Sequence, residues 1–400
     1  MKRFSTLVAT AALVLLPLAV SAQQKNTIKI GQTMPYSGPA SAYGAIGKSS
    51  TAYFAMVNER GGVNGRKIEL ISLDDGYSPP KTVEQTRKLV ENEEVLLLFS
   101  TLGSATNAAI QKYVNAKKVP HLFIAAGTSN WGQPDKFPWS MGWQPNYRSE
   151  GRVYAQHVLQ SVKSPKIAIL YQNDDFGREL VSGLMEGLGN DAKSMVVMQK
   201  SYETTDPTID SQMISLAGSG ANVFLNATTP KFGAQAIRKA NEIGWNPSVH
   251  LLSQIASSVG STLKPAGLDK SKGVISAAFL KDISDPQWKD DKEVAQWHAW
   301  MDKYQPGVDK NDFSNVYGYA ITATLVKVLE QAGNDLTRDN IMAQAAKLKD
   351  VHVPMLLPGI VLNTSAKDFF PLEQMQLQRF NGERWELFGK VIDGHMKAGL

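Results

Sequence analysis

The chain has 400 residues, with 42 Lys and Arg against 37 Asp and Glu, and 43% of its residues are apolar. This length and composition predict a folded protein of one to three domains and not a disordered chain. The sequence contains no cysteine, which excludes disulfide scaffolds, iron–sulfur clusters, cysteine-ligated zinc, thiol nucleophiles and a lipid-modified N-terminal cysteine.

The first 22 residues have the pattern of a secretory signal peptide. Lys2 and Arg3 precede the apolar run 7–16, and the small residues at 20–22 resemble a cleavage site. The apolar run is too short to cross about 30 Å of hydrocarbon. Removal of residues 1–22 leaves 40 basic against 37 acidic residues, a net charge of +3. We therefore predict a soluble periplasmic protein that does not bind nucleic acid, because no basic stripe is present.

The first part of the remaining chain alternates between strand-like and helix-like segments. Strands are predicted at 27–33, 66–74, 95–99 and 121–124, and helices at 45–59, 81–91 and 104–115. The run 95–99 is continuously apolar, as expected of a parallel strand that is buried on both faces.

The alternation then starts again after a stretch rich in Pro, Gly and aromatic residues at 137–146, which is the first candidate for a crossover. Strands are predicted at 166–171, 194–200, 222–225, 250–252 and 273–279, and helices at 176–188, 208–216, 232–243, 290–304, 313–331 and 338–349. The segments 376–380 and 385–392 predict a terminal hairpin with Asn381-Gly382 at its turn. Two such series predict two doubly wound, Rossmann-like α/β lobes.

Catalytic motifs are missing from the sequence. It has no phosphate-binding Gly-x-x-x-x-Gly-Lys-Ser/Thr, no His-Glu-x-x-His and no Gly-x-Ser-x-Gly, and its six histidines are scattered. Asp174-Asp175 could form a carboxylate pair, but we favour a role as charges at a helix N-terminus. Asp74-Asp75-Gly76 similarly predicts a strand-exit turn. We therefore expect no enzyme, no metal site and no cofactor, which disfavours an exported hydrolase.

Three loops that follow predicted strands are rich in Gly, hydroxyl-bearing and small residues, at 37–44, 101–106 and 125–129. Ligands of doubly wound sheets bind beyond the carboxyl ends of the strands. Free N–H groups at a helix N-terminus, together with Ser and Thr hydroxyls, can hold a carboxylate without a cationic side chain. The alternative is ordinary helix capping by Ser104 and Thr128. Because three such loops converge on one sheet edge, we predict a ligand site there.

One stretch of the sequence resembles a specific motif of a known protein family. Residues 57–70 (VNERGGVNGRKIEL), followed by Asp74-Asp75, resemble the N-terminal hallmark of the periplasmic leucine/isoleucine/valine-binding protein family, the type I solute receptors of ABC importers. The loop 37–39, Gly103-Ser104 and the turn 175–177 match as well, and the resemblance extends from about residue 28 to 391. It implies two lobes joined by three crossovers, a ligand cleft between them, and hinge closure on binding.

The resemblance also implies lobe boundaries and site residues. The first lobe would comprise 23–145 and 281–353, and the second 146–280 and 354–400. Tyr43 and Phe176 resemble the family's aromatic cleft residues, and Ser104, Ala126 and Thr128 its carboxylate-holding residues. The complete set of expected ligand-binding residues is Tyr43, Gly103, Ser104, Ala126, Gly127, Thr128, Phe176, Thr228, Gln254 and Tyr317.

One departure from the family pattern bears on the ligand. Amino-acid receptors of this family usually place an acid in the second lobe to pair with the ligand's ammonium, but the corresponding loop here holds Gln254 and no carboxylate. An unpaired buried ammonium is costly. Either Asp174 or Asp175 takes this role, or the ligand is an acid or amide without an α-ammonium. Trp131, Trp143 and Tyr147 could line a flat pocket for an aromatic acid, or pack at the hinge.

The sequence thus predicts a monomeric periplasmic receptor that delivers a small ligand to ABC permease and ATPase subunits. A branched-chain amino acid or a related small amphipathic carboxylate is the first expectation, and an aromatic acid or amide is the alternative. A ligand sensor for a membrane receptor would use the same cleft, and neighbouring permease and ATPase genes would distinguish a transporter component from a sensor.

Overall fold

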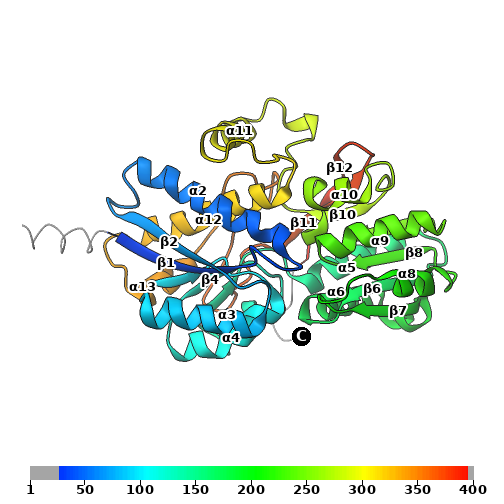
Figure 1. Ribbon diagram of the computed structural model, residues 1–400, viewed down its shortest axis with the longest axis horizontal. Helices are drawn as coiled ribbons and strands as arrows, with labels where there is room; N and C mark the ends of the chain where they lie inside the picture. The colour runs from blue at the N-terminus through cyan, green and yellow to red at the C-terminus, as the bar shows by residue number, and fades with distance from the viewer. Residues whose placement is uncertain (1–26, 395–400) are drawn as a thin grey trace, which may run out of the picture.

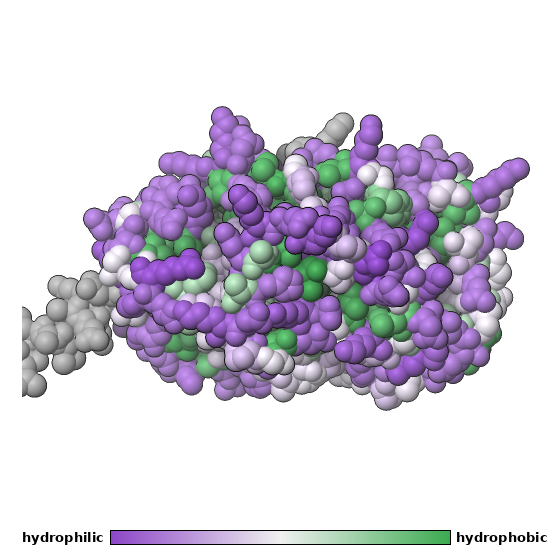
Figure 2. Space-filling model, turned by 90° about the horizontal axis from the view of Figure 1, so that it is seen from above, coloured by the Kyte–Doolittle hydropathy of each residue, from purple (hydrophilic) through white to green (hydrophobic). Residues whose placement is uncertain are grey.

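The computed structural model describes residues 27–394, which form two α/β lobes lying side by side (Figure 1). The predicted signal peptide lies outside the described residues. Hydrophilic residues cover most of the face seen in Figure 2. Within residues 27–394, no helix is both long and apolar enough to cross a membrane.

The first lobe is built on a five-stranded, fully parallel sheet with the order β2-β1-β3-β4-β5. Its strands are β1 Thr27–Met34, β2 Lys67–Asp74, β3 Leu97–Phe99, β4 His121–Ile124 and β5 Ser140–Gly142. As the apolar run at 95–99 predicts, every residue of β3 is buried. The short edge strand β5 lies inside the stretch that we predicted to be the crossover, so the chain leaves this lobe only after Gly142.

Helices cover both faces of the first sheet (Figure 1). One face carries α2 and α12, whose apolar residues pack in the largest hydrophobic core, and the other carries α3 and α4 around a smaller core. The helices of this lobe are α2 Gly44–Glu59, α3 Pro79–Arg87, α4 Ser104–Ala116, α11 Lys292–Tyr304, α12 Phe313–Ala332 and α13 Arg338–Ala345. The fully buried Trp297 and the nearly buried Trp300 of α11 belong to the largest core.

The second lobe has a seven-stranded sheet with the order β12-β11-β10-β9-β8-β6-β7. Its strands are β6 Ile167–Gln172, β7 Val196–Tyr202, β8 Val223–Ala227, β9 Val249–Leu252, β10 Ile275–Ala278, β11 Gln374–Phe380 and β12 Trp385–Asp393. Strands β6 to β10 are parallel, whereas β11 and β12 form the predicted antiparallel hairpin at the edge. The two-lobed, doubly wound α/β fold is therefore confirmed.

The helices of the second lobe again lie on both faces of the sheet, with α5 and α6 on one side and α8 and α9 on the other (Figure 1). They are α5 Tyr147–Ser161, α6 Asp175–Leu188, α7 Ala192–Met195, α8 Asp210–Ala217, α9 Pro230–Glu242 and α10 Lys264–Ala266. Asp174 is the N-cap of α6 and accepts a hydrogen bond from the Gly177 N–H at 3.3 Å. This contact agrees with the predicted role of Asp174 at a helix N-terminus.

The chain passes between the lobes three times. It crosses after β5 at 143–146, returns after β10, and enters the second sheet for good at β11. Residues between Val353 and Leu372 pack in the core of the first lobe. The packing therefore favours a last crossover near residue 373 and not at 353. With that change, we propose that each lobe consists of two separate segments of the chain.

Candidate functional site

A cavity lies between the two lobes at the carboxyl ends of the parallel strands. Its empty volume is about 570 Å³, including space open to solvent. The lining residues come from both lobes and from the crossover region; they are Tyr43, Ile46, Tyr77, Leu102, Gly103, Ala125, Gln144, Tyr147, Phe176, Thr229, Gln254, Ile255, Phe279, Phe313, Ser314 and Tyr317. The position of the cavity is the one expected for a ligand of doubly wound sheets.

Aromatic side chains dominate the wall of the cavity. Tyr147 at the start of α5 and Phe176 at the start of α6 pack with their ring centroids 4.8 Å apart. Tyr317 of α12 packs edge-on against the buried Trp143, with centroids 4.9 Å apart. Rigid rings offer a large apolar contact area to a ligand. Of the three aromatic residues considered near the crossover, only Tyr147 lines the cavity; Trp131 and Trp143 are buried in the lobe interior.

The structure divides the sequence-predicted site residues into two groups. Five of them line the cavity: Tyr43, Gly103, Phe176, Gln254 and Tyr317. The other five, Ser104, Ala126, Gly127, Thr128 and Thr228, are not among its lining residues.

The residues of the second group lie close behind the wall. The Thr128 hydroxyl donates to the Ser104 hydroxyl at 2.8 Å, and the carbonyl of Gly127 accepts from the N–H of Tyr147 at 2.8 Å. The Thr228 hydroxyl donates to Asn226, while the next residue, Thr229, lines the cavity. These contacts support the wall. Direct contact between these five residues and a ligand stays a prediction.

The N-terminus of α4 reaches the cavity at Gly103. Gly103 has φ +101°, and a Cβ atom on it would lie 2.5 Å from the Tyr77 ring, so both the backbone and the packing require glycine here. No side chain caps this end of α4. The first N–H groups of this helix therefore have no side-chain acceptor, and the helix terminus meets the cavity at Gly103.

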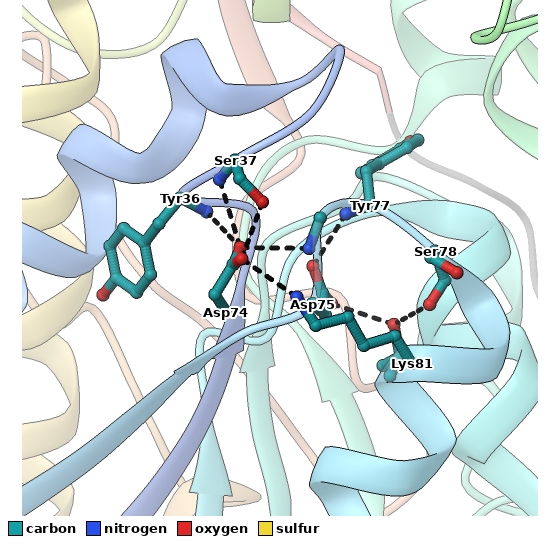
Figure 3. A network of polar contacts seen from close by, with 9 residues as sticks. Tyr36, Ser37, Asp74, Asp75, Tyr77, Ser78 and Lys81 are labelled. Carbon is teal, nitrogen blue, oxygen red and sulfur yellow. Dashed lines mark hydrogen bonds and ion pairs between the residues drawn. The ribbon is translucent and has the colours of Figure 1, made fainter.

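Tyr77 is a lining residue that our sequence interpretation missed, although the Asp74-Asp75-Gly76 turn that holds it was recognised. Figure 3 shows Asp74 between the loops that follow β1 and β2, with the Tyr77 ring directed away from the polar network. Asp74 accepts hydrogen bonds from the Tyr36 N–H at 2.9 Å and from the Ser37 hydroxyl at 2.6 Å. Burial alone would raise the pKa of the Asp74 carboxyl, but these and other hydrogen bonds hold it well below its usual range.

Asp75 fixes the backbone of Tyr77 directly. The fully buried Asp75 carboxylate accepts from the Tyr77 N–H at 2.9 Å (Figure 3). It also accepts from the Thr82 hydroxyl at 2.9 Å. Tyr77 has φ +60°, which is costly for a residue with a side chain. The two aspartates therefore hold a strained turn that places an aromatic ring in the cavity wall.

Within residues 27–394, no charged side chain lines the cavity. Asp174, considered as a partner for a ligand ammonium, instead accepts from the Gln172 amide at 2.6 Å and caps α6, and burial raises its pKa to about 6. Asp175 is about half exposed and lies 3.8 Å from Arg178. Neither aspartate is placed in the wall, so the cavity offers an ammonium group no carboxylate.

Several hydrogen bonds join the lobes across the cleft. The Tyr43 hydroxyl donates to the Ile255 carbonyl at 3.1 Å, and the Gln172 amide donates to the Tyr77 hydroxyl at 3.4 Å. Glu179 of α6 accepts from the N–H of Ser129 at 2.8 Å and also from its hydroxyl. The structure is therefore in a closed form, with the wall residues of both lobes in contact.

Comparison with known proteins places this architecture among binding proteins. The chain is 24% identical over 282 residues to the Leu/Ile/Val-binding protein homolog 7 of Brucella suis biovar 1, covering 67% of each chain. It superposes with a TM-score of 0.82 and 14% identity on a branched-chain amino acid ABC transporter protein of Thermus thermophilus solved with valine, covering 92% and 96% of the two chains. It superposes with a TM-score of 0.78 and 17% identity on a solute-binding protein of Rhodopseudomonas palustris BisB5 solved with 3,4-dihydroxybenzoic acid, covering 94% and 99%.

The structural similarities show a shared fold, and the family match covers nearly all described residues. Residues 27–384 match the family described as periplasmic binding protein. The similar proteins are named for ligand binding and not for catalysis. From its sequence and its two-lobed architecture alike, this chain belongs to the periplasmic binding protein family.

Proposed function

We propose that this protein is the periplasmic substrate-binding component of an ABC importer and that its ligand is a small aromatic acid or amide without an α-ammonium group. The cavity between the lobes carries the proposal, because aromatic side chains dominate its wall and no charged residue of 27–394 lines it. A buried ammonium without a partner is costly, so an α-amino acid fits this wall poorly. The ligand's carboxylate or amide oxygen would bind at the uncapped N-terminus of α4.

A branched-chain amino acid is the second candidate. A relative named as a leucine-, isoleucine-, valine-, threonine- and alanine-binding protein of Pseudomonas aeruginosa is 22% identical over 338 residues. The apolar part of the wall, with Ile46, Leu102 and Ile255, could hold an aliphatic side chain. In this protein, however, the ammonium would have to be held without a carboxylate in the cavity wall.

A thermal-shift screen distinguishes these ligands. The chain from residue 23 onward is heated with leucine, valine, benzoate, 4-hydroxybenzoate, 3-phenylpropanoate and phenylacetamide. A ligand at 100 times its Kd stabilises the folded state by about 2.7 kcal/mol, so we expect an aromatic acid or amide to raise the Tm by several degrees. A rise with leucine or valine alone would establish the second candidate. If no probe raises the Tm, the assigned ligand class is wrong.

Closure of the lobes on the ligand would create the form that docks on the permease, and the ATPase would drive release into the membrane subunits. The closed form is stabilised by contacts that do not touch the cavity, such as that between Glu179 and Ser129. A ligand that binds only the closed form gains affinity from every contact that favours closure.

Glu179→Ala is accordingly expected to weaken binding about tenfold, because a charge-assisted hydrogen bond that exists only in the closed form is lost. Without ligand, the variant should be more open, with a larger radius of gyration in small-angle X-ray scattering. Glu186→Ala is the matched control on the same helix: Glu186 pairs with Arg148 and Arg152 at 3.1 Å within the second lobe. An unchanged affinity and radius for Glu179→Ala would refute a role for this contact in closure.

A further inference from the structure

Two buried glutamines, Gln144 and Gln254, contribute side-chain amides to the cavity wall. Gln144 follows β5 and is 6% exposed, and Gln254 follows β9 and is 2% exposed. Both line the cavity, and the residue after Gln144 is Pro145, whose carbonyl accepts a hydrogen bond from the Gln254 amide at 3.4 Å. Both side chains therefore line the same cavity, and the Gln254 amide contacts the residue that follows Gln144.

The orientation of the Gln254 amide follows from its partner. The Pro145 carbonyl can only accept, so the amide nitrogen of Gln254 must face it and the oxygen must point elsewhere. The backbone N–H of Gln254 donates to the buried Glu150 at 2.7 Å, which fixes the position of the residue. Its Oε1 atom is buried and has no hydrogen-bond partner within residues 27–394.

In Gln144 the unpaired atom is the amide donor, whereas in Gln254 it is the amide acceptor. Its Oε1 atom accepts from the Tyr317 hydroxyl at 2.9 Å, and its Nε2 atom is buried without a partner in the described part of the chain. The wall thus combines an unused donor on Gln144 with an unused acceptor on Gln254. A buried polar atom that stays unpaired is costly, so a ligand that pairs both atoms gains affinity over one that pairs neither.

We propose that the ligand carries, in addition to its ring and the oxygen bound at α4, a neutral polar group that accepts from Gln144 Nε2 and donates to Gln254 Oε1. This inference rests on the proposed function and narrows its ligand class. A hydroxyl or a carboxamide can do both, whereas a second carboxylate cannot donate and an ammonium cannot accept. The ligand class is therefore that of hydroxylated or carbamoylated aromatic acids.

Matched probes test the inference by isothermal titration calorimetry of the chain from residue 23 onward. One series is benzoate, 4-methoxybenzoate, 4-hydroxybenzoate, 4-carbamoylbenzoate and terephthalate; a longer series is 3-phenylpropanoate and 3-(4-hydroxyphenyl)propanoate. On at least one framework we expect the hydroxyl or carboxamide member to bind tenfold or more tightly than the member without it, because a site built for hydrogen bonds rejects a ligand that lacks them. Terephthalate should bind no better than benzoate.

Variants show whether the glutamines cause this preference. Gln254→Met and Gln144→Met keep the side-chain length and remove the amide, and in each variant the ratio of the two affinities, polar member over unsubstituted member, should fall to within about threefold. Gln111→Met is the control, since Gln111 is buried in α4 but does not line the cavity. Circular dichroism confirms folding, and the two variants test the proposal independently.

The two proposals fail in distinguishable ways. If the acids bind but their polar and unsubstituted members bind equally on both frameworks, the glutamine pair does not select the ligand and the proposed aromatic-acid function stands. A preference retained in both methionine variants also overturns the inference. If none of the acids binds, the proposed function itself fails.

Discussion

Gly183→Ala is expected to lower the free energy of unfolding by about 3 kcal/mol and to weaken ligand binding at least tenfold. Gly183 lies on α6 where this helix crosses α5, and a Cβ atom at this position would lie 2.1 Å from the Arg148 carbonyl oxygen. Gly151 of α5 is equally close-packed, since its Cβ would lie 2.4 Å from the Leu180 carbonyl oxygen. Backbone atoms cannot rotate away, so the helices must separate.

The separation reaches the ligand site because the same two helices carry its wall. Tyr147 begins the first turn of α5, and Phe176 lies in the first turn of α6. Their packed rings both line the cavity. Moving α6 away from α5 separates the rings and opens the aromatic wall, so stability and affinity fall together.

Urea unfolding and calorimetric titration measure the two effects. Gly218→Ala is the matched control: Gly218 is exposed, a Cβ atom on it would meet no other atom closer than 3.5 Å, and its conformation is right-handed helical with φ −70°. Its substitution should change stability by no more than about 0.5 kcal/mol. Equal stabilities of the Gly183 and Gly218 variants would contradict the close packing of α5 and α6.

Glu150 should make the stability of the protein depend on pH between about 4.5 and 7. The side chain is fully buried, and one of its oxygens accepts from the Gln254 N–H at 2.7 Å. Burial raises the pKa of Glu150 to about 7, against the lowering effect of its hydrogen bonds. The folded state therefore holds a proton that the unfolded chain releases near pH 4.5.

The direction in which stability changes with pH follows from the number of protons that each state binds. Because the folded state binds more protons, the raised pKa of Glu150 adds to the free energy of unfolding. This addition is complete below about pH 4.5 and is lost as the pH rises to about 7. The shift from 4.5 to about 7 corresponds to about 3 kcal/mol. Asp174, whose pKa burial raises to about 6, acts in the same direction in the parent and in any Glu150 variant.

Glu150→Gln isolates this effect, since glutamine keeps an oxygen for the Gln254 N–H and does not titrate. We expect the unfolding free energy of the parent minus that of the variant to be about 2.5 kcal/mol larger at pH 5 than at pH 8, measured by urea unfolding. Glu84→Gln, at an exposed carboxylate, should give a difference that is flat with pH. A flat difference for Glu150→Gln as well would show that the carboxyl is not buried as described.

The local sequence predicted the elements of the fold well. An alternating pattern identifies β1, and mainly apolar runs identify β3, β6 and β8, because strand periodicity and burial depend on neighbouring residues. The Asn381-Gly382 turn predicted the terminal hairpin for the same reason. The three-residue strand β5 was missed, because a short edge strand between Pro138 and Pro145 has almost no local signal.

The ligand site was predicted only in part. Tyr43, Gly103 and Phe176 follow strand ends in loops with a clear pattern, and the structure places them in the cavity wall. Phe279 and Phe313, which also line the wall, had no such signal, since they come from a crossover and a helix start far along the chain. Gln144 appeared only as part of the crossover stretch, and its place in the same cavity as Gln254 could not be derived from spacing.

The sequence alone determined the class of this protein: an α/β chain of two lobes, without catalytic motifs and with strand-end loops suited to a ligand. These properties depend on periodicity, composition and short motifs, which act over a few residues. Only the tertiary structure decided which residues meet in the cleft, that Asp174 caps α6 without entering the wall, and that Gln144 and Gln254 line the same cavity. Such contacts arise from crossovers that join residues about a hundred positions apart, and no local pattern encodes them.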